Sequence, residues 1–117
     1  NKQFEIITDE KIPVQDESID LILCLGTIHH ISDTSVKKII NQFNEKLKIG
    51  GRVILIDSAP AYEQDHSIVR FIVSMDIGDD IRTLEHTLAV IGNKFKIIEK
   101  QVKKIGRYNF NFIILEK

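Results

Sequence analysis

The sequence predicts an α/β fold that combines a partly parallel sheet with an antiparallel hairpin at its C-terminal end. Apolar runs of strand length, Ile19–Leu25 and Arg52–Asp57, flank an amphipathic segment, which is the order of a parallel strand-helix-strand unit. Two further strand-like segments, Phe95–Val102 and Tyr108–Leu115, enclose Gly106 and predict a hairpin with a longer loop.

Length and composition are those of one small domain spanning residues 1–117. Of the 117 residues, 43% are hydrophobic and 28% are charged, and the net charge is −1. This balance gives no general affinity for nucleic acid, and we interpret the basic stretch Lys94–Arg107 as a solvated edge. No apolar run is long enough to span a membrane and no signal peptide is evident, so we expect a cytoplasmic protein with no membrane partner.

The first third of the chain contains two expected strands. Phe4–Thr8 has the β-branched content of a short strand. Ile19–Leu25 is interrupted only by Asp20, which favours a strand covered on both faces. We expect Asp20 to bind backbone amides, and we expect Cys24 to act as a small buried hydrophobe.

A helix is expected after Ser32, where residues typical of a helix N-cap cluster. Apolar residues then recur at helical spacing: Val36, Ile39, Ile40, Phe43 and Leu47. Gly50 and Gly51 predict a left-handed C-terminal cap and a tight turn into the next strand.

Two more helices are expected after Ser58. Periodicity predicts one over Gln64–Met75, ended by Gly78, and another over Ile81–Ile91. The second has its apolar stripe at Leu84, Leu88 and Ile91.

Two carboxylates and two histidines are the candidates for chemistry. Asp9 and Asp57 each follow an apolar strand, so both could accept hydrogen bonds from a ligand at one crevice, and a solvated carboxylate is an equally good interpretation. Either His29 or His30 could act as a general base, although packed loop histidines explain them at least as well.

A metal site is not expected. Adjacent histidines on a strand or loop diverge, and His66 and His86 lack metal-ligand spacing. Without further context, the residues indicate a ligand-binding α/β domain.

The spacing of these parts is more specific than the parts themselves. An acidic residue after a strand, I-P-V-Q-D-E-S-I-D-L-I-L, T-I-H-H-I, an amphipathic helix, L-K-I-G-G-R-V-I-L-I-D and a terminal hairpin closely resemble the class I S-adenosylmethionine-dependent methyltransferases. The resemblance covers essentially the whole chain and implies a Rossmann-like sheet. A weaker signature, M-D-I-G-D-D-I-R, lies at Met75–Arg82.

The resemblance implies a cofactor, S-adenosylmethionine, and a small-molecule acceptor of the methyl group. It assigns cofactor contacts to six positions: Asp9, Glu10, Lys11, Leu25, Gly26 and Thr27. The residue matching Asp9 accepts a hydrogen bond from the adenine amino group in such enzymes. His30 would lie near the site of methyl transfer, where a base is needed only for an acidic acceptor proton.

The sequence also departs from the family pattern. The glycine-rich cofactor loop and the acidic residue that ends the second strand are absent, and both would precede Asn1. We therefore expect a C-terminal part of a methyltransferase domain that alone binds the cofactor weakly or not at all. The Ile19–Leu25 strand would have a bare edge, completed by its own first strand, by another copy or by a missing N-terminal segment.

Other functions stay open at this point. A non-catalytic methyltransferase-like remnant that serves as an interaction or regulatory module is the main alternative, and another α/β nucleotide-binding enzyme is a third. Arg82 could bind an anionic acceptor group, but a surface ion pair with Asp79 or Glu85 is favoured.

Overall fold

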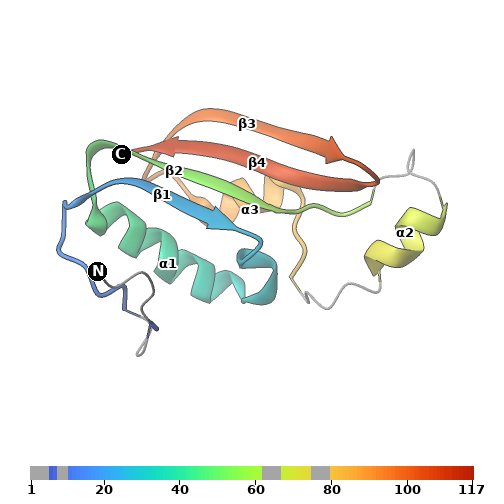
Figure 1. Ribbon diagram of the computed structural model, residues 1–117, viewed down its shortest axis with the longest axis horizontal. Helices are drawn as coiled ribbons and strands as arrows, with labels where there is room; N and C mark the ends of the chain where they lie inside the picture. The colour runs from blue at the N-terminus through green and yellow to red at the C-terminus, as the bar shows by residue number, and fades with distance from the viewer. Residues whose placement is uncertain (1–5, 8–10, 62–66, 75–79) are drawn as a thin grey trace.

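The computed structural model describes residues 6–7, 11–61, 67–74 and 80–117 of the chain (Figure 1). Its elements, in chain order, are β1 (Ile19–Leu25), the single 3-10 turn η1 (Ile28–His30), α1 (Asp33–Lys46), β2 (Leu47–Ser58), α2 (Ser67–Ser74), α3 (Leu84–Ile91), β3 (Lys96–Ile105) and β4 (Tyr108–Glu116). The expected sequence of strands and helices is present from β1 onward. Of the strand expected at Phe4–Thr8, only Ile6 and Ile7 are described, and neither lies in a strand.

The four strands form one mixed sheet in the order β1-β2-β4-β3 (Figure 1). β1 and β2 are parallel, whereas β4 is antiparallel to both β2 and β3. This arrangement confirms the predicted mixture of a parallel unit and a C-terminal hairpin. The hairpin loop is tight, contrary to expectation, because Ile105 pairs with Tyr108 and Gly106 takes a φ of 62° between them.

α1 begins where the sequence predicts. Ser32 caps the helix, and its hydroxyl accepts a hydrogen bond from the Ser35 amide at 3.3 Å. The C-terminal end differs from the prediction, because the helix stops at Lys46 and Leu47 is already extended. Gly50 does have a left-handed φ of 81°, but it lies inside β2 and does not cap the helix.

Gly51 is required by a close approach of two chain segments. A Cβ at this position would lie 2.8 Å from the Lys48 carbonyl oxygen and 3.2 Å from that of Asp20. The start of β1 therefore packs directly on the backbone of β2. The Asp20 side chain is exposed and binds Lys48 Nζ at 3.0 Å, and it makes none of the expected contacts with backbone amides of the described residues.

Of the two later helices, α3 is shorter than expected, and α2 can be compared with its prediction only in part. α3 begins at Leu84 because Thr83 is its N-cap, with the hydroxyl accepting from the His86 amide at 3.1 Å. α2 lies within the expected Gln64–Met75 range, whose two ends fall outside the described residues. None of the helices in the described part of the chain has the length and apolar character needed to cross a membrane.

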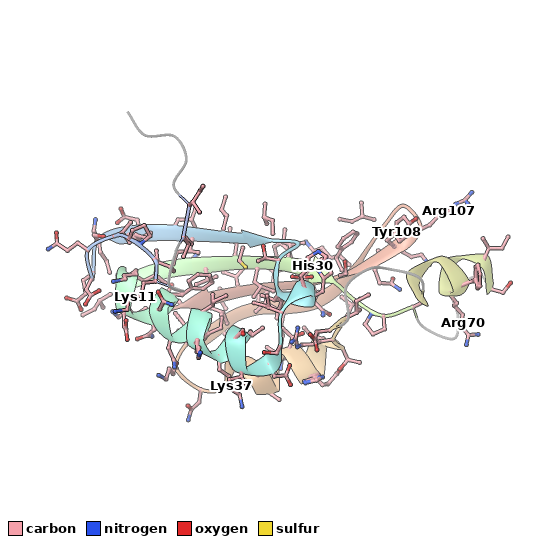
Figure 2. All side chains as sticks on the ribbon, turned by 90° about the horizontal axis from the view of Figure 1, so that it is seen from below. Lys11, His30, Lys37, Arg70, Arg107 and Tyr108 are labelled. Carbon is pink, nitrogen blue, oxygen red and sulfur yellow. The ribbon has the colours of Figure 1, made fainter. Side chains whose placement is uncertain are left out.

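The core lies between the sheet and the two helices α1 and α3, which cover the same face of the sheet (Figure 2). Fully buried side chains come from α1 and from the two central strands: Val36, Ile40, Val53, Leu55, Ile113 and Leu115. Alternation along β2 and β4 places these strand residues on the helix-covered face.

No described helix covers the opposite face of the sheet (Figure 2). On β1, Leu21, Leu23 and Leu25 are 50%, 59% and 56% exposed. The prediction that β1 is covered on both faces is therefore wrong for the described residues. The same strand forms the edge of the sheet, since β2 is its only strand partner in this part of the chain.

Candidate active site

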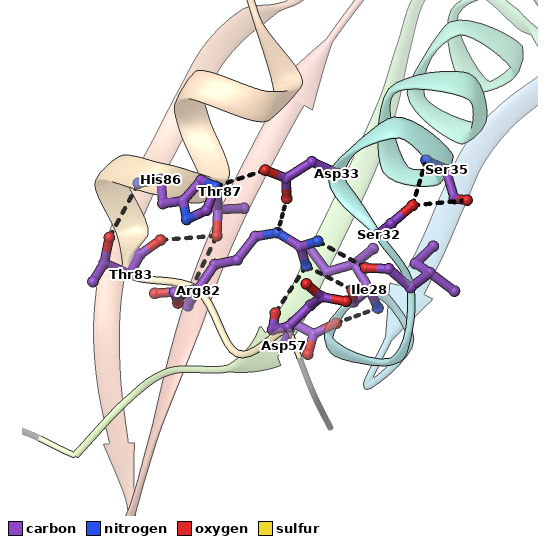
Figure 3. A network of polar contacts seen from close by, with 12 residues as sticks. Ile28, Ser32, Asp33, Ser35, Asp57, Arg82, Thr83, His86 and Thr87 are labelled. Carbon is purple, nitrogen blue, oxygen red and sulfur yellow. Dashed lines mark hydrogen bonds and ion pairs between the residues drawn. The ribbon is translucent and has the colours of Figure 1, made fainter. Parts of the chain in front are cut away.

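The carboxyl ends of β1 and β2 lie side by side because the two strands are parallel. Directly after β1, the Gly26 amide donates to the Ile56 carbonyl at 2.8 Å. Gly26 has a φ of 60°, a conformation that glycine adopts without the penalty of a side chain, and the chain then enters η1. This turn is the centre of a polar network (Figure 3).

Asp57 holds the turn from the end of β2. Its carboxylate accepts hydrogen bonds from the Ile28 amide at 2.6 Å, from the Ser58 amide at 2.7 Å, and from Nδ1 of His29. Asp57 is 2% exposed, so it is neither a solvated carboxylate nor a group open to a ligand. Because a carboxylate only accepts, His29 carries its proton on Nδ1.

Arg82 holds the turn from the other side (Figure 3). Its Nη1 donates to the Ile28 carbonyl at 2.7 Å and to that of Asp80 at 2.9 Å, and its Nη2 donates to the Ile31 carbonyl at 2.7 Å. Arg82 is 3% exposed. The expected surface ion pair with Glu85 and the alternative of binding an anionic acceptor are therefore wrong, because the guanidinium is buried and already bound; Asp79, the other expected partner, lies outside the described residues.

Asp33 joins α1 to α3 through the same arginine. Its carboxylate accepts from Nε of Arg82 at 2.7 Å and from Nε2 of His86 at 2.9 Å. The hydrogen bond from His86, followed by that from Arg82, lowers the pKa of the Asp33 carboxyl from its usual value. The exposed end of the network is therefore charged at neutral pH.

Asn111, on β4, is also hydrogen-bonded to this network. Its side-chain amide donates to the Arg82 carbonyl at 2.8 Å, and Thr87 Oγ1 lies 3.4 Å away. Asn111 faces Asp57 across the β2-β4 ladder, and both side chains are buried. Its carbonyl oxygen has no hydrogen-bond partner among the described residues.

The exposed surface above this network carries four of the predicted site residues: Leu25, Gly26, Thr27 and His30. The Thr27 hydroxyl donates to the Leu25 carbonyl at 3.0 Å. His30 is exposed, and its ring centroid lies 3.9 Å from that of the buried His29. The two histidines thus differ in role, since His29 is held inside and His30 faces outward.

Of the remaining predicted cofactor contacts, only Lys11 is described, and it is not brought to this surface. Asp9 and Glu10 lie outside the described residues. Lys11 lies toward the C-terminal half of α1, away from His30 (Figure 2), beside a hollow that Gln42 and Lys46 also line. Its contact with the cofactor stays a prediction.

Cys24 is buried, as predicted, at 7% exposure. Burial, with a smaller contribution from the Asp57 charge, raises the pKa of its thiol, which keeps the thiol neutral and unreactive. Over the described ranges, no three histidine, cysteine, aspartate or glutamate residues lie close enough to hold a metal ion.

Sequence reasoning missed the roles of Asp57 and Arg82 because their contacts are long-range. The Arg82 bonds to Ile28 and Ile31 join residues 54 and 51 positions apart in the chain. The only sequence signal was the segment Met75–Arg82, which the resemblance singled out without assigning a structural role to its arginine.

A family comparison gives the first independent indication of what this chain is similar to. Residues 2–55 match the model of the family described as "Methyltransferase domain". An uncharacterized methyltransferase of Bacillus subtilis (strain 168), YcgJ, is 39% identical over 57 residues, which are 49% of this chain and 22% of YcgJ. The chain thus spans about a fifth of this curated relative.

Solved structures show the same fold. A SAM-dependent methyltransferase from Methanosarcina mazei gives a TM-score of 0.72 at 15% identity, over 97% of this chain and 66% of that protein. Human N-acetylserotonin methyltransferase, solved in complex with SAM, gives a TM-score of 0.66 at 19% identity, over 92% of this chain and 31% of that protein. The predicted Rossmann-like fold of class I methyltransferases, and with it the resemblance, is therefore confirmed.

Proposed function

We propose that this chain forms the C-terminal part of a catalytic domain that methylates a small molecule. Two findings support the proposal: the chain has the fold of the class I S-adenosylmethionine-dependent methyltransferases, and it matches the methyltransferase-domain family. The observation that carries this proposal is the exposed segment at the carboxyl end of β1. Leu25, Gly26 and Thr27 lie at the carboxyl end of a parallel strand, where open α/β sheets bind their ligands.

The residues present fit one side of S-adenosylmethionine. Gly26 has no atom within 4 Å of the position of an added Cβ, so a ligand can approach its backbone closely. Leu25 adds an exposed apolar side chain. The sequence has no glycine-rich loop for the methionine portion, so this chain by itself contributes only part of the site.

S-adenosylmethionine, when bound, supplies a methyl group on a sulfonium, which is a good leaving group. The chain then needs chiefly to orient the acceptor, and a base is required only when the acceptor proton is acidic. His30 is the exposed imidazole nearest the proposed cofactor segment along the chain, so we assign it the place beside the acceptor.

The class of acceptor is inferred from relatives of the same fold. One of them is named for N-acetylserotonin, and another, from Haemonchus contortus, is a phosphoethanolamine N-methyltransferase solved with phosphomonomethylethanolamine and S-adenosylhomocysteine. Both acceptors are small molecules. This supports a small-molecule acceptor and leaves its identity open.

Titration with S-adenosylhomocysteine tests the proposed site. In two-dimensional NMR spectra of this chain, we expect millimolar cofactor product to shift the amide signals of Leu25, Gly26 and Thr27. The amide of Gly50, near the opposite, amino-terminal end of β2, is the internal control. In a longer protein that includes the glycine-rich loop, Asp9→Ala is expected to abolish binding measured by calorimetry.

Two results would contradict this assignment. Unchanged signals at all three amides would remove these residues from the cofactor site and favour the non-catalytic remnant. Micromolar affinity of this chain alone would instead show that it needs no further segment.

The outer edge of β1 is where we place the rest of the domain. The backbone of β1 has no strand partner on this side in the described part of the chain, and a groove of about 460 Å³ between β1 and α1 continues the edge. Its apolar lining includes Leu23, Ile39 and Phe43. We propose that an N-terminal segment of a longer polypeptide occupies this edge, and that copies of the chain associate through it when the segment is absent.

Sedimentation analysis tests this edge. The chain alone is expected to show an average mass above 13.4 kDa that rises with concentration. Leu23→Lys, which places a charge on the β1 face, should return the mass to that of a monomer. Ile105→Lys is the matched control, because Ile105 is 60% and Leu23 is 59% exposed. A monomeric wild-type chain with fully protected β1 amides would refute the proposal.

A further inference from the structure

The turn at the proposed site makes few hydrogen bonds within itself that would stabilise its conformation. η1 spans only three residues, and Thr27, at its N-cap, makes no side-chain capping bond. Its internal hydrogen bonds are long, at 3.2 Å from the His30 amide to the Thr27 carbonyl and 3.3 Å from Ile31 to Ile28. The conformation of the turn therefore depends on groups outside it.

Different groups outside the turn bind its hydrogen-bond donors and its hydrogen-bond acceptors. Asp57 binds the donors of the turn, while the segment that leads into α3 binds its acceptors. Arg82 takes the carbonyls of Ile28 and Ile31, and the Asp80 amide donates to the carbonyl of His29 at 3.2 Å. Three of the four carbonyls from Ile28 to Ile31 are thus bound by residues 80 and 82.

We propose that Arg82 is a positioning residue, whose planar guanidinium fixes the turn Ile28–Ile31 and thereby sets where His30 and the Leu25–Thr27 segment stand relative to each other. The inference rests on the function proposed above for those residues. It also gives a role to Arg82, the last residue of the signature noted in the sequence, because this arginine binds the turn on the cofactor side of the sheet.

Only an arginine can make this set of contacts. Its Nε, Nη1 and Nη2 bind the Asp33 carboxylate and three carbonyls at once, using four of its five N–H groups in a rigid fork. A lysine keeps the charge opposite Asp33 but concentrates its donors on one nitrogen. Lysine at this position should therefore preserve the ion pair better than the shape of the turn.

Native-state amide exchange on this chain separates positioning from general stability. In Arg82→Gln, we expect exchange at the Ile28, His30 and Ile31 amides to rise by about 10- to 100-fold, with a smaller rise in the Val53 and Leu55 amides of β2. Arg82→Lys should give an intermediate rise. Val90→Ala, which weakens buried packing in α3 away from the turn, is the control for loss of stability.

The ¹⁵N signals of His29 give a second readout that stability alone would not move. In the wild-type chain the proton lies on Nδ1, facing Asp57. Release of the turn in Arg82→Gln should shift this tautomer toward Nε2–H in molecules that are still folded. Val90→Ala should leave the tautomer unchanged.

The outcomes decide the inference in either direction. A rise confined to the turn, together with the tautomer shift, supports it. Wild-type exchange rates in Arg82→Lys would overturn it, because the planar guanidinium would then be dispensable. An equal rise in amide exchange at the turn and in β2 would also overturn it, because Arg82 would then only stabilise the fold. Neither readout uses the cofactor, so a failed titration with S-adenosylhomocysteine would count against the proposed function alone.

Discussion

Replacing Asp57 by alanine is expected to lower the free energy of unfolding by about 3–5 kcal/mol. The change removes a buried carboxylate and leaves the amides of Ile28 and Ser58 and Nδ1 of His29 without their acceptor. Each such group was desolvated on folding and cannot recover its bond to water. Urea denaturation followed by circular dichroism measures the loss.

Asp16→Ala is the matched control for this prediction. Asp16 also pairs with a cation, Lys46 Nζ at 2.6 Å, but its side chain is 68% exposed. Exposed pairs contribute about 0–1 kcal/mol, so this variant should unfold close to the wild-type midpoint. Equal losses in the two variants would show that the Asp57 contacts contribute no more than a surface pair.

Leu55→Ala is expected to lower the free energy of unfolding by about 2–5 kcal/mol. Leu55 is fully buried at the centre of the sheet, where its neighbours in register are Cys24 on β1 and Ile113 on β4. Strands on both sides restrict the collapse of the cavity that the substitution leaves, so the loss should approach the upper part of this range. The same denaturation experiment measures it.

Ile49→Ala in the same strand controls for the change in side-chain size and strand propensity. Ile49 is 85% exposed, so its truncation removes little buried area. A loss for Ile49→Ala as large as that for Leu55→Ala would mean that burial in the core does not determine the effect.

The elements that local sequence determines were the most predictable part of the fold. The apolar run of β1, the Ser32 cap of α1 and the hairpin of β3 and β4 are all present, because each depends on residues that are near in sequence. The exposure of Leu21 and Leu23 was not predictable in this way. An apolar strand looks the same in the sequence whether or not another element covers its second face.

The candidate site was likewise predictable only where it depends on residues that are near in sequence. Gly26, Thr27 and His30 follow β1 within a few residues, so their exposure at its carboxyl end could be expected from the sequence, while their contacts with a ligand stay a prediction. The sequence could not show that Asp57 is buried or that Arg82 crosses the fold to bind the turn. Those contacts depend on how β2 and α3 pack, and no local periodicity encodes a partner about 50 residues away.

The strand order also has a consequence for how the sheet is assembled. β4 lies between β2 and β3, although it follows both in the chain, and its contact with β2 joins residues as far apart as Arg52 and Glu116. The hairpin of β3 and β4 can form early because its closure is local, whereas docking on β2 requires a long loop to close. During synthesis, the edge of β2 that pairs with β4 therefore stays unpaired until the β4 residues have left the ribosome. We expect misassembly of the sheet to occur mainly in this interval.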